Sequence, residues 1–168
     1  MELVMVGGSR YNTEIMNLTK SATRKYKRIC YATFNKTYSA MLKKFRSLKP
    51  EINPEAFYFV DAITPRVFKT KESERCIFLD SLDDLQAVAK RILAFVKNNK
   101  IEYVIFDSVS SFLVYKDDKE AMVFFNYFLS SLEELGVGIM LTVLYEDFER
   151  PLVKQLKMRT DHVEVAAL

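Results

Sequence analysis

Short apolar segments alternate along the chain with helix-like segments, and this alternation constrains the fold more than any other feature. Apolar runs that end at polar or turn-forming residues predict strands at 3–6, 29–34, 57–61, 76–79, 103–107, 137–144 and 162–165. Apolar residues at helical spacing predict helices at 12–25, 37–48, 82–98, 117–135 and 148–158. Continuously apolar strands joined by helices are typical of a parallel sheet covered on both faces. We therefore predict an α/β fold, a three-layer α/β/α sandwich with a mainly parallel sheet.

Local signals place the ends of some of these elements. Asn12 or Thr13 is expected to cap the first helix, and Ser81 to cap the third. Gly136 is a suitable residue to end the helix over 117–135. The polar connection over 62–74, with its run of charged residues, is predicted to be a mobile loop.

Length and composition exclude several classes of protein. A chain of 168 residues predicts one domain, 1–168, large enough to fold without a metal or disulfide. No apolar run is long enough for a membrane span and no signal peptide is evident, so we expect a cytoplasmic protein without membrane partners. Cys30 and Cys76 lie in apolar runs and are interpreted as core residues. With His162 as its single histidine, the chain cannot form a histidine zinc cluster.

Charge is distributed unevenly along the chain. Residues 1–50 contain eleven Lys or Arg and two Asp or Glu, whereas residues 51–168 contain fourteen and twenty. A basic segment of this kind can form a face that binds nucleic acid. The other interpretation is that these residues are the solvated faces of two helices, because no aromatic stacking pattern accompanies them.

The carboxyl ends of parallel strands are where ligands bind in such a sheet. The first of these ends carries Gly7, Gly8, Ser9 and Asn12, a pattern that could leave a remnant of a phosphate-binding loop. A working Walker loop also needs a second glycine, a lysine and an adjacent hydroxyl, and these are absent here. A simple turn from strand to helix is the alternative, with Arg10 either contacting an anion or lying in solvent.

A second strand end carries a stronger signal. The segment 103–113, YVIFDSVSSFL, is an apolar strand that ends in Asp107-Ser108, and it resembles the Walker B segment of RecA-like and KaiC-like ATPases. The layout of the chain is similar to that group along nearly its whole length. The segments TFNKTY at 33–38 and FVDAIT at 59–64 resemble those of small archaeal KaiC-like proteins. The resemblance implies a RecA-like core and a remnant of a nucleotide site that includes Asp107 and Ser108.

The chain departs from that family at the residues that carry catalysis. Asn35 and Lys36 stand where KaiC-like ATPases have acidic residues, and neither can activate water as a base. Because the phosphate-binding lysine is also missing, we expect no catalytic residue and no ATPase activity. Asp107 would then be a magnesium ligand only if a nucleotide is still bound, and otherwise an N-cap of the following turn. The serines at 108, 110 and 111 are interpreted as turn and cap hydroxyls.

Further polar residues are expected to line a cleft at the strand ends: Asn35, Lys36, Tyr38, Asp61, Thr142 and Glu146.

Three functions follow as hypotheses. The first is a non-catalytic KaiC-like domain that acts in regulation or scaffolding by binding a protein partner or a second copy, as a dimer. The aromatic cluster Phe124, Phe125, Tyr127 and Phe128 cannot all face the core, so some members could face a partner. The alternative is an ATP-binding protein that holds magnesium at Asp107, although no cofactor is expected under the first hypothesis. The third is a nucleic-acid-binding domain that uses the basic segment.

Overall fold

The computed structural model describes residues 1–66, 68 and 73–166. Within these residues, seven strands form one parallel sheet in the order β4-β3-β2-β5-β6-β1-β7. The strands are β1 (Glu2–Val6), β2 (Ile29–Thr33), β3 (Phe57–Asp61), β4 (Cys76–Phe78), β5 (Tyr103–Asp107), β6 (Gly138–Leu144) and β7 (His162–Ala166). The sequence-based prediction of a parallel α/β fold is confirmed.

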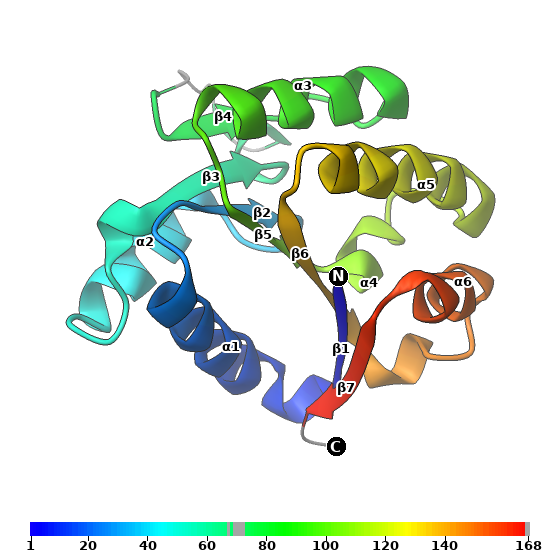
Figure 1. Ribbon diagram of the computed structural model, residues 1–168, viewed down its shortest axis with the longest axis horizontal. Coiled ribbons are helices and arrows are strands. Elements are labelled where there is room, and N and C mark those ends of the chain that lie inside the picture. The colour runs from blue at the N-terminus through cyan, green and yellow to red at the C-terminus, as the bar shows by residue number, and fades with distance from the viewer. Residues whose placement is uncertain (67, 69–72, 167–168) are drawn as a thin grey trace.

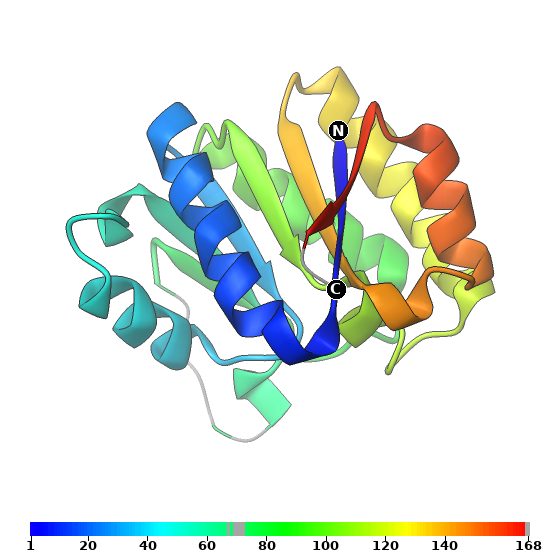
Figure 2. The same cartoon turned by 90° about the horizontal axis from the view of Figure 1, so that it is seen from below.

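Helices cover both faces of the sheet (Figures 1 and 2). The helices are α1 (Tyr11–Lys25), α2 (Tyr38–Ser47), α3 (Leu85–Asn98), α4 (Val109–Phe112), α5 (Asp118–Glu134) and α6 (Pro151–Arg159). Short 3-10 helices lie at Gly8–Arg10, Pro54–Ala56, Thr64–Arg66 and Tyr145–Asp147. α1 and α2 pack on one face, and α3 to α6 pack on the other.

Successive residues of each strand point to opposite faces, and both faces are apolar. In β5, Tyr103 and Ile105 belong to the core under α1 and α2, whereas Val104 and Phe106 belong to the core under the other helices. A strand buried on both sides needs apolar residues at every position. This explains why the strands appear in the sequence as continuous apolar runs.

The helix caps differ from the predicted ones. α1 begins at Tyr11 after a 3-10 turn, and its N-cap Arg10 makes no side-chain capping bond, so neither Asn12 nor Thr13 caps it. α3 begins at Leu85, and Asp84 caps it in place of Ser81. Ser81 bonds within its own loop instead, because its hydroxyl accepts from the Asp83 backbone N–H.

Other predicted boundaries are closer to the structure. α5 begins after its N-cap Asp117, and Gly136 follows its end with a positive φ of 67°, as predicted. α6 begins three residues later than predicted, at Pro151. Of the predicted loop over 62–74, residues 67 and 69–72 lie outside the described residues.

The strand order creates two places where the helices leave adjacent strands on opposite faces. One lies between β1, which is followed by α1, and β6, which is followed by α6. The other lies between β2, followed by α2, and β5, followed by α4 and α5. Such switch points are where open parallel sheets bind ligands. In the described part of the chain, no helix has the length and apolarity needed to cross a bilayer.

Candidate functional site

The Asp107 carboxylate lies at the switch point between β5 and β2 and is fully buried. Oδ1 accepts hydrogen bonds from Tyr11 Oη at 2.5 Å and from Asn35 Nδ2 at 3.1 Å. Oδ2 accepts a short hydrogen bond from Tyr31 Oη. The charge is therefore satisfied by three donors from α1, β2 and the loop after β2. Hydrogen bonds to an ionised, buried carboxylate are among the stronger kind in proteins.

Thr142 of β6 extends this network. Its Oγ1 lies 2.7 Å from Tyr11 Oη and donates to the Phe106 carbonyl oxygen at 3.0 Å. Tyr11 thus joins the carboxyl ends of β5 and β6 from the start of α1. Burial, followed by the nearby Asp107 charge, raises the pKa of both Tyr11 and Tyr31 well above the usual range. Both hydroxyls remain protonated donors at neutral pH.

The turn after β1 occupies the position predicted for a phosphate loop. Gly7 is the N-cap of the 3-10 turn at Gly8–Arg10, and the Arg10 N–H donates to the Gly7 carbonyl at 3.1 Å. The Gly8 N–H donates to Glu146 Oε1 at 3.2 Å, across the switch point between β1 and β6. Ser9 is exposed on this turn. A phosphate approaching Gly8 would meet the negative charge of Glu146.

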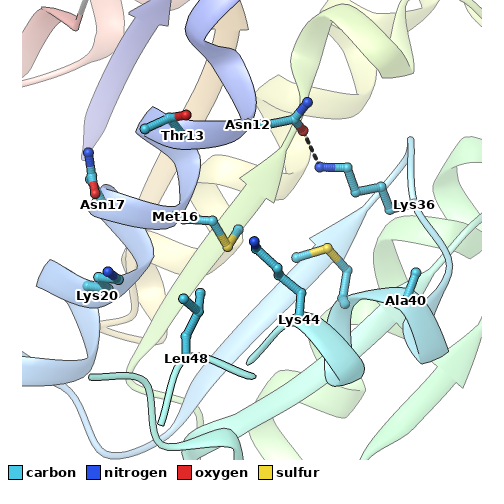
Figure 3. Close-up of a pocket in the computed structure, with 10 residues that line it drawn as sticks. Asn12, Thr13, Met16, Asn17, Lys20, Lys36, Ala40, Lys44 and Leu48 are labelled. Atoms are coloured by element: carbon cyan, nitrogen blue, oxygen red, sulfur yellow. Dashed lines mark hydrogen bonds between the residues drawn. The ribbon is translucent and has the colours of Figure 1, made fainter. Parts of the chain in front are cut away.

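Asn12 and Lys36 come together beside this turn. Lys36 Nζ donates a short hydrogen bond to Asn12 Oδ1, which links α1 to the loop after β2 (Figure 3). Arg10, for which an anion contact and a solvated position were both considered, is exposed, and its guanidinium lies 3.9 Å from the Glu14 carboxylate.

Asp61, at the end of β3, is the centre of a second group of hydrogen bonds, which includes Tyr38. Its carboxylate accepts from the backbone N–H groups of Tyr38, Ile63 and Thr64 at 2.6, 2.7 and 2.8 Å, and from the Thr64 hydroxyl. The Tyr38 ring packs against Phe59, with 5.0 Å between ring centroids. Asp61 therefore fixes the start of α2 and the turn after β3.

The serines after Asp107 act as cap and turn hydroxyls. Ser108 is the N-cap of α4, where its Oγ accepts from the Ser111 backbone N–H at 3.1 Å. The alternative that Asp107 itself caps this turn is wrong, because its carboxylate points to the tyrosines. Ser110 Oγ accepts from the Leu144 N–H at 2.8 Å and ties α4 to the end of β6.

Sequence reasoning missed Tyr11 and Tyr31, the two main partners of Asp107. Tyr31 sits in a buried apolar strand and Tyr11 at a helix start, so both fit the pattern of ordinary core residues. The available signal was the hydroxyl itself, because a buried tyrosine needs a hydrogen-bond partner. Two tyrosines on the face that also carries Asp107 could have suggested the network.

The described residues contain no group of three or more His, Cys, Asp or Glu side chains that could hold a metal ion. The three side chains that donate to Asp107 are hydroxyl and amide groups. Hydroxyl and amide groups that donate to a carboxylate orient it and stabilise its charge. The network joins the end of β5 to β2 and to the start of α1, and through Tyr11 it also reaches β6.

No family model and no curated protein matches the chain. Among solved structures, it is similar to a KaiC-like protein from the hyperthermophilic archaeon Pyrococcus horikoshii, with a TM-score of 0.65 and 14% identity. The similarity covers 99% of this chain and 70% of that one. At this identity the likeness concerns the fold, and the chain thus has the RecA-like α/β fold seen in a KaiC-like protein.

Proposed function

We propose that this chain is a RecA-like domain that does not hydrolyse nucleotide and acts in regulation or scaffolding through contacts with protein. One observation carries the proposal: the chain's own side chains occupy the groups that a magnesium nucleotide would need. Glu146 accepts the Gly8 N–H, and Tyr11, Tyr31 and Asn35 donate to Asp107.

The energetic reason lies in what a nucleotide would have to displace. Phosphoryl transfer depends on positive charge and free N–H donors around the phosphates. Here Glu146 adds a negative charge to the turn, and moving the Tyr31 hydroxyl away would leave the buried Asp107 charge short of a donor. Leaving a buried charged group unsatisfied costs more than about 1–3 kcal/mol. The same contacts favour a rigid domain over a catalytic one.

An exposed apolar pair favours contact with protein. Val123 and Tyr127 lie one helical turn apart on α5 and are 69% and 41% exposed. Their neighbours Phe124, Phe125 and Phe128 are buried in the core, so the aromatic cluster divides between core and surface. Aromatic residues, tyrosine among them, are enriched at the centres of protein interfaces.

Calorimetric titration with ATP and with ADP, each with and without magnesium, tests the proposal. We expect no magnesium-dependent binding at millimolar nucleotide and no release of phosphate on incubation. Saturable micromolar binding that requires magnesium would contradict the proposal and favour the ATP-binding alternative. In that case Asp107→Ala should abolish the magnesium dependence. Nucleic-acid binding stays a prediction from the sequence, to be tested by the salt dependence of any affinity.

A further inference from the structure

A cavity of about 440 Å³ lies between α1 and α2 (Figure 3). These two helices cover the face of the sheet opposite α3 to α6. Ten residues line the cavity: Asn12, Thr13, Met16, Asn17, Lys20, Lys36, Ala40, Met41, Lys44 and Leu48. Its volume falls in the range of small-molecule sites, about 300–1,000 Å³. It is distinct from the Asp107 network, because none of its lining residues contacts that carboxylate.

The cavity has an apolar floor and a polar rim. Met16 and Met41 are buried and Leu48 is half-buried, whereas Asn12, Asn17 and Lys44 are exposed. Methionine side chains adapt their shape to the ligand that they contact. An apolar floor with a few convergent polar groups is the usual composition of a site for an organic ligand.

Three lysines and no acidic residue line the cavity. Lys20 forms an ion pair with Glu51, outside the lining. Lys36 is held by the neutral Asn12 amide, and Lys44 extends from α2 toward Met16 of α1 (Figure 3). Within the described part of the chain, neither Lys36 nor Lys44 forms an ion pair. Two ammonium groups beside one cavity favour a ligand with more than one negative charge.

We infer that this cavity binds a small organic phosphate, with its phosphate at Lys36 and Lys44 and its apolar body on Met16 and Met41. A phosphate monoester carries a charge of about −1.5 to −2 at neutral pH, which matches the two ammonium groups. Lysine binds phosphate as a point charge through up to three donors. The neutral Asn12 and Asn17 amides can donate to the remaining oxygens.

Phenyl phosphate is the first probe, followed through the methyl resonances of Met16 and Met41 in the intact chain. We expect saturable shifts of both resonances at up to millimolar probe. Inorganic phosphate and phenol, which carry only one half of the ligand each, should bind more weakly. Because the probe holds no nucleoside and needs no magnesium, its result is independent of the nucleotide titration.

Lys44→Ala should weaken phenyl phosphate binding about fivefold or more, since it removes one of the two charges near the phosphate. Lys43→Ala is the matched control: it makes the same charge change on the same helix, at an exposed position outside the lining, and should leave affinity unchanged. The inference would be overturned by the absence of saturable shifts, or by equal losses of phenyl phosphate affinity in Lys44→Ala and Lys43→Ala. Tighter binding of citrate than of phenyl phosphate would overturn the assignment to phosphate.

Discussion

Two tyrosine hydroxyls make Asp107 a structural centre at the scale of single residues. Tyr11 comes from α1 and Tyr31 from β2, and each donates to a different oxygen of the same buried carboxylate. The sequence predicted the position of Asp107 at a strand end but not these partners. A hydroxyl on a buried aromatic ring leaves no trace in the apolar pattern, so that pattern alone does not pair either tyrosine with Asp107.

Tyr31→Phe removes one donor to Asp107 while leaving the ring in place. We expect the free energy of unfolding at neutral pH to fall by about 1–3 kcal/mol, and Tyr11→Phe to have a similar effect. Tyr38→Phe is the control, since its ring packs on Phe59 and it should change stability by less than about 0.5 kcal/mol. Urea denaturation measures all three. Equal losses in Tyr31→Phe and Tyr38→Phe would contradict a special role for the hydroxyls at Asp107.

The raised pKa of Tyr31 also sets a pH dependence. In the unfolded chain tyrosine ionises near pH 10, whereas burial and the Asp107 charge keep Tyr31 protonated in the fold. The stabilising contribution is therefore present below about pH 10 and is lost as pH rises above it. Ionisation of Cys30 lowers stability in the same direction. Its effect begins at a lower pH, because a thiol in the unfolded chain has a pKa of 9.0, whereas burial raises the pKa of Cys30 to about 12. Above pH 10, the free energy of unfolding of Tyr31→Phe should decline less steeply than that of the unsubstituted chain.

At the scale of elements, strands were easier to predict than helix ends. β3 and β5 have the predicted bounds, because five successive apolar or strand-ending residues admit few alternatives. The predicted N-caps of α1 and α3 were wrong, because several residues near the start of each helix could serve as caps. The choice among them depends on how the preceding loop packs, and the sequence pattern does not contain that information.

The start of β6 is set by a close contact that only glycine permits. A Cβ on Gly138 would lie 2.8 Å from Cδ2 of Tyr103, whose ring stacks on Tyr26 with 4.3 Å between centroids. Gly138→Ala should lower the free energy of unfolding by about 1–3 kcal/mol, because the stacked ring has to shift. Thermal or urea denaturation measures the loss.

A second variant separates this contact from a general effect of alanine. In the Tyr103→Leu background, the additional cost of Gly138→Ala should largely disappear, since the ring that it meets is gone. If Gly138→Ala lowers the free energy of unfolding by the same amount in that background, the close approach to Tyr103 is not the cause of the loss.

In the whole molecule, hydrogen bonds connect the carboxyl ends of the central strands, and the apolar pair Val123 and Tyr127 is exposed on α5. Its fold class could be predicted from the sequence because the alternation of elements is regular over the chain. The cavity between α1 and α2 could not, because its walls come from two helices whose separation depends on packing. The Asn12–Lys36 contact joins a residue predicted in the remnant of a phosphate-binding loop to one predicted in the strand-end cleft.

The exposed pair Val123 and Tyr127 predicts that the molecule self-associates. We expect the chain to form a dimer at high micromolar concentration, and the double variant Val123→Glu with Tyr127→Glu to be monomeric, since charges at an apolar contact disfavour association. Sedimentation velocity measures both. Val165→Glu, an exposed apolar position on β7, is the control and should leave the dimer intact. A dimer that persists in the double variant would place the interface elsewhere.

The place of β1 in the sheet has a consequence for the order of folding. β1 lies between β6 and β7 and pairs with no other strand among the described residues. Both neighbours come from residues 138–166, so β1 acquires its partners only after those residues have been synthesised. Pairing across such a large sequence separation is slow to form. Until then β1 is an apolar segment without a sheet, and exposed apolar segments of this kind are prone to aggregate.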